Sequence, residues 1–183
     1  MNMTEMDILT LQSRMDQGKL TSKELVISYL KRIQAYDQGG PYINAVAELN
    51  PDAVFIAESL DRERAFRGSR GPLHGIPVLV KDNISTGDKM HTTAGSLALN
   101  DNFALHDAPL IKKLRKAGAV ILGKTNLSEF ARYIANEFPD GYSSRGGQVK
   151  NPYDPSFPIS GSSSGSAAAV AALFCTAAIG TET

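Results

Sequence analysis

Residues 160–183 read SGSSSGSAAAVAALFCTAAIGTET, and this stretch says most about the fold of the chain. A Gly/Ser-rich loop runs without a break into an Ala-rich apolar segment. The last serines of the loop are placed to cap a helix, and its amides point into a polarised helix N-terminus. The alternative interpretation is a flexible loop or linker, which Ser and Gly clusters commonly form.

A second informative stretch, GIPVLVKDN, occupies residues 75–83. The continuous apolar run at 76–80 predicts a short strand that is covered on both faces. Lys81 follows this strand, where desolvation disfavours its ammonium form and makes the neutral amine accessible as a base. Alternatively, Lys81 simply emerges from the strand end into solvent.

Upstream of these stretches, the first seventy residues are predicted to be mostly helical. Thr21 and Glu24 form a capping box, and the apolar residues that follow have the spacing of one buried helix face: Val26, Tyr29, Leu30 and Ile33. Residues 45–49 are strand-like, and Pro51 leads into a second helix whose buried face holds Ala53, Ile56, Ala57 and Leu60. Residues 67–72 are predicted to form a loop.

Between the two informative stretches, Asp107 is predicted to cap a helix that continues through Ala117, and residues 119–122 are predicted to form another buried strand. The order strand, helix, strand indicates an α/β sheet with helices packed on it. Asn126 and Glu129 are candidates for capping a further helix. Residues 138–159 are rich in Pro and Gly and predict a long, ordered surface loop that helps to form a substrate cleft.

Taken together, residues 75–83 and 160–183 resemble the core of the amidase signature family, whose members hydrolyse carboxamides with a Ser, Ser, Lys triad. Lys81 and Ser162 match the lysine and the middle serine of that triad. The nucleophilic serine is expected soon after Thr183, outside this chain. The resemblance implies an α/β fold with helices around a mixed, largely parallel sheet that is incomplete at the C-terminus. It implies one partial domain over 1–183, with a helical region at 1–70 and the N-terminal part of the amidase core at 71–183.

The serine loop departs from the usual family pattern Gly-Gly-Ser-Ser-Gly-Gly, because Ser160 and Ser164 replace two glycines. This form, together with YSSRGGQ at 142–148, is similar to the peptide amidase branch. That branch favours a small amide or a peptide amide as substrate over a tRNA-linked one. The resemblance also implies a cis peptide bond before Ser162, which costs about 3 kcal/mol outside X-Pro bonds.

The implied mechanism begins when neutral Lys81 takes the proton of Ser162, which takes the proton of the nucleophilic serine that attacks the amide carbonyl. An oxyanion and substrate loop is expected to include Gly161, Ser163 and Thr183, with backbone N–H groups near Thr183 stabilising the oxyanion. The resemblance requires no metal or other cofactor. His74, His91 and His106 lack the spacing of metal ligands and are interpreted as structural or solvated.

Composition limits the classes of partner. Nineteen basic residues balance nineteen acidic ones, which gives no electrostatic reason to expect nucleic acid or an anionic membrane as partner. The apolar run at 167–179 is shorter than the ~20 residues of a membrane span. One cysteine and a start without a signal sequence indicate a reducing, cytoplasmic setting.

Three other patterns have simpler interpretations. Residues 118–125, GAVILGKT, match the Walker A pattern, but the variable positions are strand-like, which argues against a phosphate-binding loop. Lys112, Lys113, Arg115 and Lys116 alternate with apolar residues, as on a solvated helix face. Cys175 lies in an apolar run and is interpreted as a core residue.

The sequence is compatible with three hypotheses about function. The chain is the N-terminal portion of an amidase and is inactive alone, or it is half of a split enzyme, or it is a non-catalytic binding or interaction domain on an amidase scaffold. The helix predicted from residue 167 is apolar nearly all round, so we expect self-association or a complementing C-terminal half to cover it.

Overall fold

The computed structural model describes residues 3–182 and has the α/β architecture predicted from the sequence. In this part of the chain the α-helices are α1 (Ile8–Asp16), α2 (Ser22–Tyr36), α3 (Ala53–Arg67), α4 (Pro109–Lys116) and α5 (Ser164–Ala171). The strands are β1 (Val46–Leu49), β2 (Pro77–Lys81), β3 (Val120–Thr125), β4 (Tyr142–Ser143), β5 (Gly147–Gln148) and β6 (Ala177–Ile179). Short 3₁₀ turns are η1 (Met3–Glu5), η2 (Leu97–Leu99) and η3 (Glu129–Arg132).

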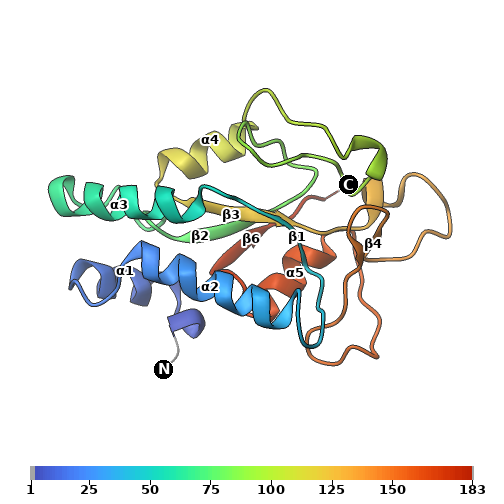
Figure 1. The fold of residues 1–183 in the computed structure, drawn as a ribbon, viewed down its shortest axis with the longest axis horizontal. Helices are drawn as coiled ribbons and strands as arrows, with labels where there is room; N and C mark the ends of the chain where they lie inside the picture. The colour runs from blue at the N-terminus through green and yellow to red at the C-terminus, as the bar shows by residue number, and fades with distance from the viewer. Residues whose placement is uncertain (1–2, 183) are drawn as a thin grey trace.

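The central sheet has the strand order β1-β3-β2-β6. Strand β2 runs parallel to both β3 and β6, whereas β1 is antiparallel to β3, so the sheet is mixed and largely parallel. Helices α3 and α4 are drawn above the strands and α1 and α2 below them (Figure 1). Both faces of β2 and β3 are therefore covered, which explains why these strands are continuous apolar runs.

Helix α2 begins as the sequence predicts. The Thr21 side chain accepts a hydrogen bond from the Glu24 amide, and the Glu24 carboxylate accepts one from the Thr21 amide. Val26, Tyr29 and Ile33 are buried along one face of this helix, and Leu30 packs partly buried beside them. The predicted capping box and the helix face that follows it are both confirmed.

Removing this cap has a measurable but moderate expected effect. Thr21→Ala leaves the Glu24 amide without its side-chain acceptor, so we expect the free energy of unfolding to fall by about 1 kcal/mol. Urea denaturation of the variant measures the change. Lys31→Ala, at an exposed position of the same helix, is the matched control and is expected to change stability by less than about 0.5 kcal/mol. Equal losses in both variants would contradict the capping role.

Two predicted helix starts are corrected by the structure. Helix α4 begins at Pro109 and not with a cap from Asp107, because the Asp107 carboxylate accepts from the Gly87 amide and pairs with Arg115. Asn126 and Glu129 cap no α-helix. Their side chains accept hydrogen bonds from Ser143 and from the Ser144 amide, so they brace the β4–β5 hairpin instead.

The segment at 138–159 is ordered, as predicted, but it is not all loop. It contains the antiparallel β4–β5 hairpin, and part of it lines a surface hollow beside α5. The exposed face of that helix includes Ala167 and Val170, so α5 is not covered all round in the described residues. The edge of β6 away from β2 has no partner strand within residues 3–182.

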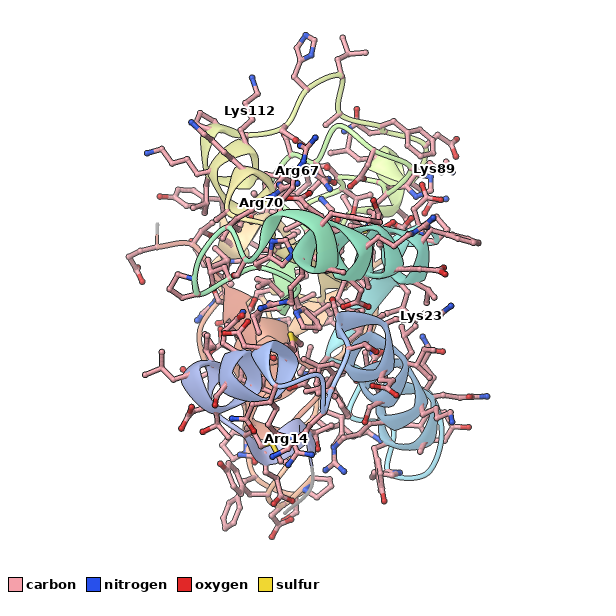
Figure 2. All side chains as sticks on the ribbon, turned by 90° about the vertical axis from the view of Figure 1, so that its left-hand side faces the viewer. Arg14, Lys23, Arg67, Arg70, Lys89 and Lys112 are labelled. Carbon is pink, nitrogen blue, oxygen red and sulfur yellow. The ribbon has the colours of Figure 1, made fainter. Side chains whose placement is uncertain are left out.

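Cationic side chains are spread over the surface of the molecule. Figure 2 shows labelled cations on one side of the molecule, from Arg14 near the bottom to Lys112 near the top, with Lys23, Arg67, Arg70 and Lys89 between them. On α4, Ile111 and Leu114 are buried while Lys112, Lys113 and Lys116 are exposed, which confirms the solvated-face interpretation of these lysines. None of the helices in the described residues is long and apolar enough to span a bilayer.

Candidate active site

Lys81 is the last residue of β2 and is completely buried, with 0% of its surface exposed. The alternative that its side chain emerges into solvent is therefore wrong. Its amine donates hydrogen bonds to three hydroxyl groups, at 2.7 Å to Ser162 Oγ, 3.0 Å to Ser163 Oγ and 2.9 Å to Thr181 Oγ1. The parallel pairing of β2 with β6 brings Lys81 and Thr181 together, because Val80 pairs with Ile179, whereas Ser162 and Ser163 come from the loop before α5.

Burial lowers the pKa of the Lys81 amine below its ordinary value of 10.5, because the ammonium ion loses its hydration. The negative charge of Glu182 acts in the opposite direction and raises that pKa, but burial is the larger effect. A larger fraction of Lys81 is therefore neutral at a given pH than for a lysine in water. The neutral amine has the lone pair that a base requires.

Ser162 lies in a loop that is held in place immediately before α5. The Ser128 amide donates to the Ser162 carbonyl at 3.1 Å, and the Ser128 hydroxyl donates to the Gly161 carbonyl at 3.1 Å. These contacts favour a structured helix entry over the alternative of a flexible linker. Within residues 3–182, the hydroxyl of Ser162 has a single hydrogen bond, the one to Lys81.

Two expectations for this loop are corrected. The described residues contain no cis peptide bond, so the bond before Ser162 is trans. Gly161 instead has a positive φ of 74°, and this left-handed conformation turns the chain so that Ser162 reaches Lys81. Ser163 occupies the N-cap position of α5, but no loop serine makes a side-chain cap there. The Ser163 hydroxyl is bound instead to Lys81 and to the backbone of Thr181.

Thr181 and Asn83 are residues of the site that the sequence reasoning missed. The Asn83 side-chain amide donates to Thr181 Oγ1 at 3.1 Å. The carboxyl ends of neighbouring parallel strands lie at the same edge of a sheet, so the apolar segments that end at Lys81 and just before Thr181 were the available signal. Thr183, the remaining predicted member of the oxyanion and substrate loop, lies outside the described residues. The roles predicted for Gly161 and Ser163 in that loop stay predictions.

The Walker A-like segment is a strand, as predicted, and it extends to Thr125. Lys124 is completely buried and donates to the Ile84 carbonyl at 2.7 Å and to Thr92 Oγ1 at 3.0 Å. Cys175 is also buried, which confirms it as a core residue, and burial raises the pKa of its thiol to about 12. Among residues 3–182, no three His, Cys, Asp or Glu side chains are arranged to hold a metal ion.

A hollow of about 450 Å³ between α1 and α3 is lined by residues that include Met15, Asp61 and Arg64. These two helices extend to the side of the molecule opposite the C-terminus (Figure 1). That hollow contains none of the residues that surround the Lys81 amine. A buried amine against a serine hydroxyl at a helix entry has the groups that general acid–base chemistry requires. Lys81 and Ser162 are therefore a candidate acid–base pair.

Comparison with known proteins identifies the family of the chain. The sequence model of the Amidase family matches residues 24–183, and the chain belongs to that family. It is 50% identical over 173 residues, 94% of its length, to a Schizosaccharomyces pombe protein named as an amidase, of which it covers 29%. It is 41% identical over 182 residues, 99% of its length, to a glutamyl-tRNA(Gln) amidotransferase subunit of Thioalkalivibrio sulfidiphilus, of which it covers 36%.

The fold of the chain is also similar to that of a solved structure. The peptide amidase from Stenotrophomonas maltophilia matches with a TM-score of 0.92 and 54% identity, over 95% of this chain and 35% of that one. The chain thus spans about a third of the length of the relatives that it matches.

Proposed function

We propose that the chain is the N-terminal portion of an amidase that hydrolyses a carboxamide C–N bond through an acyl-enzyme. Lys81 is the base and Ser162 is the proton relay. The nucleophilic serine belongs to the remainder of the enzyme, which follows Thr183 or is supplied by a second chain. The observation that carries the proposal is the 2.7 Å hydrogen bond between Ser162 Oγ and a fully buried Lys81 amine of lowered pKa.

In the reaction, Lys81 accepts the proton of Ser162, and Ser162 accepts the proton of the nucleophilic serine as its oxygen attacks the carbonyl. The protons return along the same path to the departing ammonia or amine. Water then cleaves the ester bond of the acyl-enzyme, which releases the acid and restores the serine. General acid–base groups placed in this way contribute roughly 10²–10⁴ to a rate.

For the substrate, we propose a small amide or a peptide amide rather than a tRNA-linked one. The Ser-Ser-Ser-Gly-Ser form of the loop and the 54% identity to a peptide amidase support this choice, against 41% to the tRNA-linked amidotransferase. A non-catalytic domain is the second candidate. The buried amine argues against it, because a scaffold without chemistry gains no stability from a desolvated lysine.

A chimera tests the proposal. This chain replaces the matching segment of the S. maltophilia peptide amidase, and release of ammonia from a peptide amide is measured. We expect turnover, and we expect Lys81→Ala and Ser162→Ala each to reduce kcat at least about a hundredfold. The 183-residue chain alone is expected to release no ammonia.

The matched control is Ser164→Ala, which removes a buried serine hydroxyl that has no hydrogen-bond partner in the described residues. It is expected to keep kcat within about twofold. A folded chimera whose turnover survives Lys81→Ala would overturn the proposed mechanism.

A further inference from the structure

The amine of Lys81 is surrounded by three hydroxyl oxygens, and its hydrogen-bonding capacity depends on its charge. The ammonium form has three N–H donors, which match the oxygens of Ser162, Ser163 and Thr181. The neutral amine has two N–H donors and one lone pair, so one of the three hydroxyl groups must then donate to Lys81. Which group donates decides the path of the proton.

Ser163 cannot be the donor to Lys81, because its hydroxyl already donates one hydrogen bond and accepts two. Its single proton is donated to the Thr181 carbonyl at 3.1 Å, an atom that can only accept. Its two lone pairs accept from the Thr181 amide at 3.1 Å and from Lys81 Nζ at 3.0 Å. Ser163 therefore faces Lys81 as an acceptor in either charge state of the amine.

Thr181 also faces Lys81 as an acceptor. Its Oγ1 accepts from Lys81 Nζ at 2.9 Å and from the Asn83 side-chain amide at 3.1 Å, which uses both lone pairs. Ser162 differs from these two groups, because within residues 3–182 its hydroxyl makes no hydrogen bond other than the one to Lys81 and is free to turn its proton toward the amine. It is also the nearest of the three to the amine.

We propose that Ser163 and Thr181 are positioning residues that hold the two N–H groups of neutral Lys81 and so direct its lone pair at Ser162. The inference rests on the proposed function, in which Ser162 is the relay. In the step concerned, the O–H bond of Ser162 breaks and an N–H bond forms on Lys81, while Ser162 takes a proton from the nucleophilic serine. The arrangement explains why the relay is Ser162 and not its neighbour Ser163, although both lie within 3.0 Å of the amine.

The first test needs no activity and uses the 183-residue chain. The ionisation of Lys81 is followed by NMR on a chain with isotope-labelled lysine. The Lys81 signal is assigned by its absence from the Lys81→Met variant. Thr181→Val and Ser163→Ala each remove an acceptor of the ammonium ion, so we expect the ionisation equilibrium to move roughly tenfold further toward the neutral amine. Thr181→Ser and Ser163→Thr restore the hydroxyl and are expected to restore the wild-type titration.

The control for this test is again Ser164→Ala, which removes a neighbouring hydroxyl that does not touch Lys81. Glu182, whose charge acts on Lys81, is unchanged in every variant. If Thr181→Val and Ser163→Ala move the titration of Lys81 no more than Ser164→Ala does, the inference is overturned.

The second test uses the chimera. Thr181→Val is expected to lower kcat about tenfold or more with KM unchanged, because it disturbs proton transfer and not substrate binding. Thr181→Ser is expected to recover most of the loss. A chimera that is inactive with the wild-type sequence would count against the proposed function, whereas the NMR titration would still judge the roles of Ser163 and Thr181.

Discussion

Gly165→Ala is expected to destabilise the chain by at least about 3 kcal/mol, a large effect for a single added methyl group. A Cβ at this position would lie 2.2 Å from the Asn126 carbonyl oxygen and 2.6 Å from the Ala45 carbonyl oxygen. Both contacts are with backbone, so no side-chain rotation relieves them. In an exposed helix the same substitution would stabilise by about 1 kcal/mol, so here packing decides the sign.

Urea denaturation measures the loss, with Ser164→Ala as the matched control one residue earlier in α5. The control changes a buried side chain without adding volume and is expected to stay within about 1 kcal/mol of wild type. Because α5 follows the loop that holds Ser162, the displaced helix in Gly165→Ala is also expected to separate Ser162 from Lys81. If Gly165→Ala has the stability of the wild type and an unchanged Lys81 titration, the start of α5 can move to accommodate the methyl group, and the prediction is wrong.

The sequence predicted the fold best where local pattern and tertiary packing agree. The capping box at Thr21 and the buried strand before Lys81 are examples, because each is determined by residues close together in the chain. The prediction failed where a polar side chain had a distant partner. Asp107 looks like a helix cap, but its carboxylate is occupied by the Gly87 amide, twenty residues away.

The candidate site shows the same limit. The family pattern was enough to place Lys81 and Ser162 together, whereas the apolar run before Lys81 left open whether its side chain is buried or emerges into solvent. Thr181 could not be chosen from pattern alone, because its contact with Lys81 depends on the parallel register of β2 and β6. The hydrogen bonding of the Ser163 hydroxyl likewise depends on the backbone of Thr181, eighteen residues further on.

Removing the carboxylate of Asp82 is the second substitution with a large expected effect. Asp82 follows Lys81, is completely buried, and accepts hydrogen bonds from the Thr93 amide at 3.3 Å and the Gly95 amide at 3.2 Å, as well as from the Thr93 hydroxyl. It also lies 3.7 Å from the Arg145 guanidinium. Asp82→Ala leaves buried amides without an acceptor and buried cations without a counter-charge, so we expect a loss of roughly 3–5 kcal/mol.

The exposed ion pair between Lys89 and Asp52 provides the control. It has a 2.8 Å separation, but the Lys89 side chain is 69% exposed and that of Asp52 is 36% exposed, so Asp52→Ala is expected to cost less than about 1 kcal/mol. Thermal and urea denaturation of the two variants compare a buried with an exposed carboxylate. Similar losses would contradict a structural role for the buried charges around Asp82.

The pH dependence of stability gives a second readout of the same cluster. Burial lowers the pKa of Lys124 to about 8, while the negative charge of Asp82 raises it and so limits the lowering. Because the unfolded chain binds this proton up to about pH 10 and the folded chain loses it near pH 8, stability rises with pH in that interval. Above about pH 9 the thiol of Cys175 has the opposite effect on stability. Burial raises its pKa to about 12, so the unfolded chain loses this proton while the folded chain keeps it.

The informative comparison is therefore the change in unfolding free energy between pH 7 and pH 9. Relative to Lys124→Met, the wild type is expected to gain about 1 kcal/mol over this interval. Without the Asp82 carboxylate, the pKa of Lys124 falls further, so the folded Asp82→Ala chain loses this proton at a lower pH, and its stability should rise more between pH 7 and pH 9 than that of the wild type. An equal rise in the wild type and in Asp82→Ala would mean that the two buried charges do not interact. Because Asp82 directly follows Lys81, the contacts of its carboxylate also fix the end of β2 beside the serine loop.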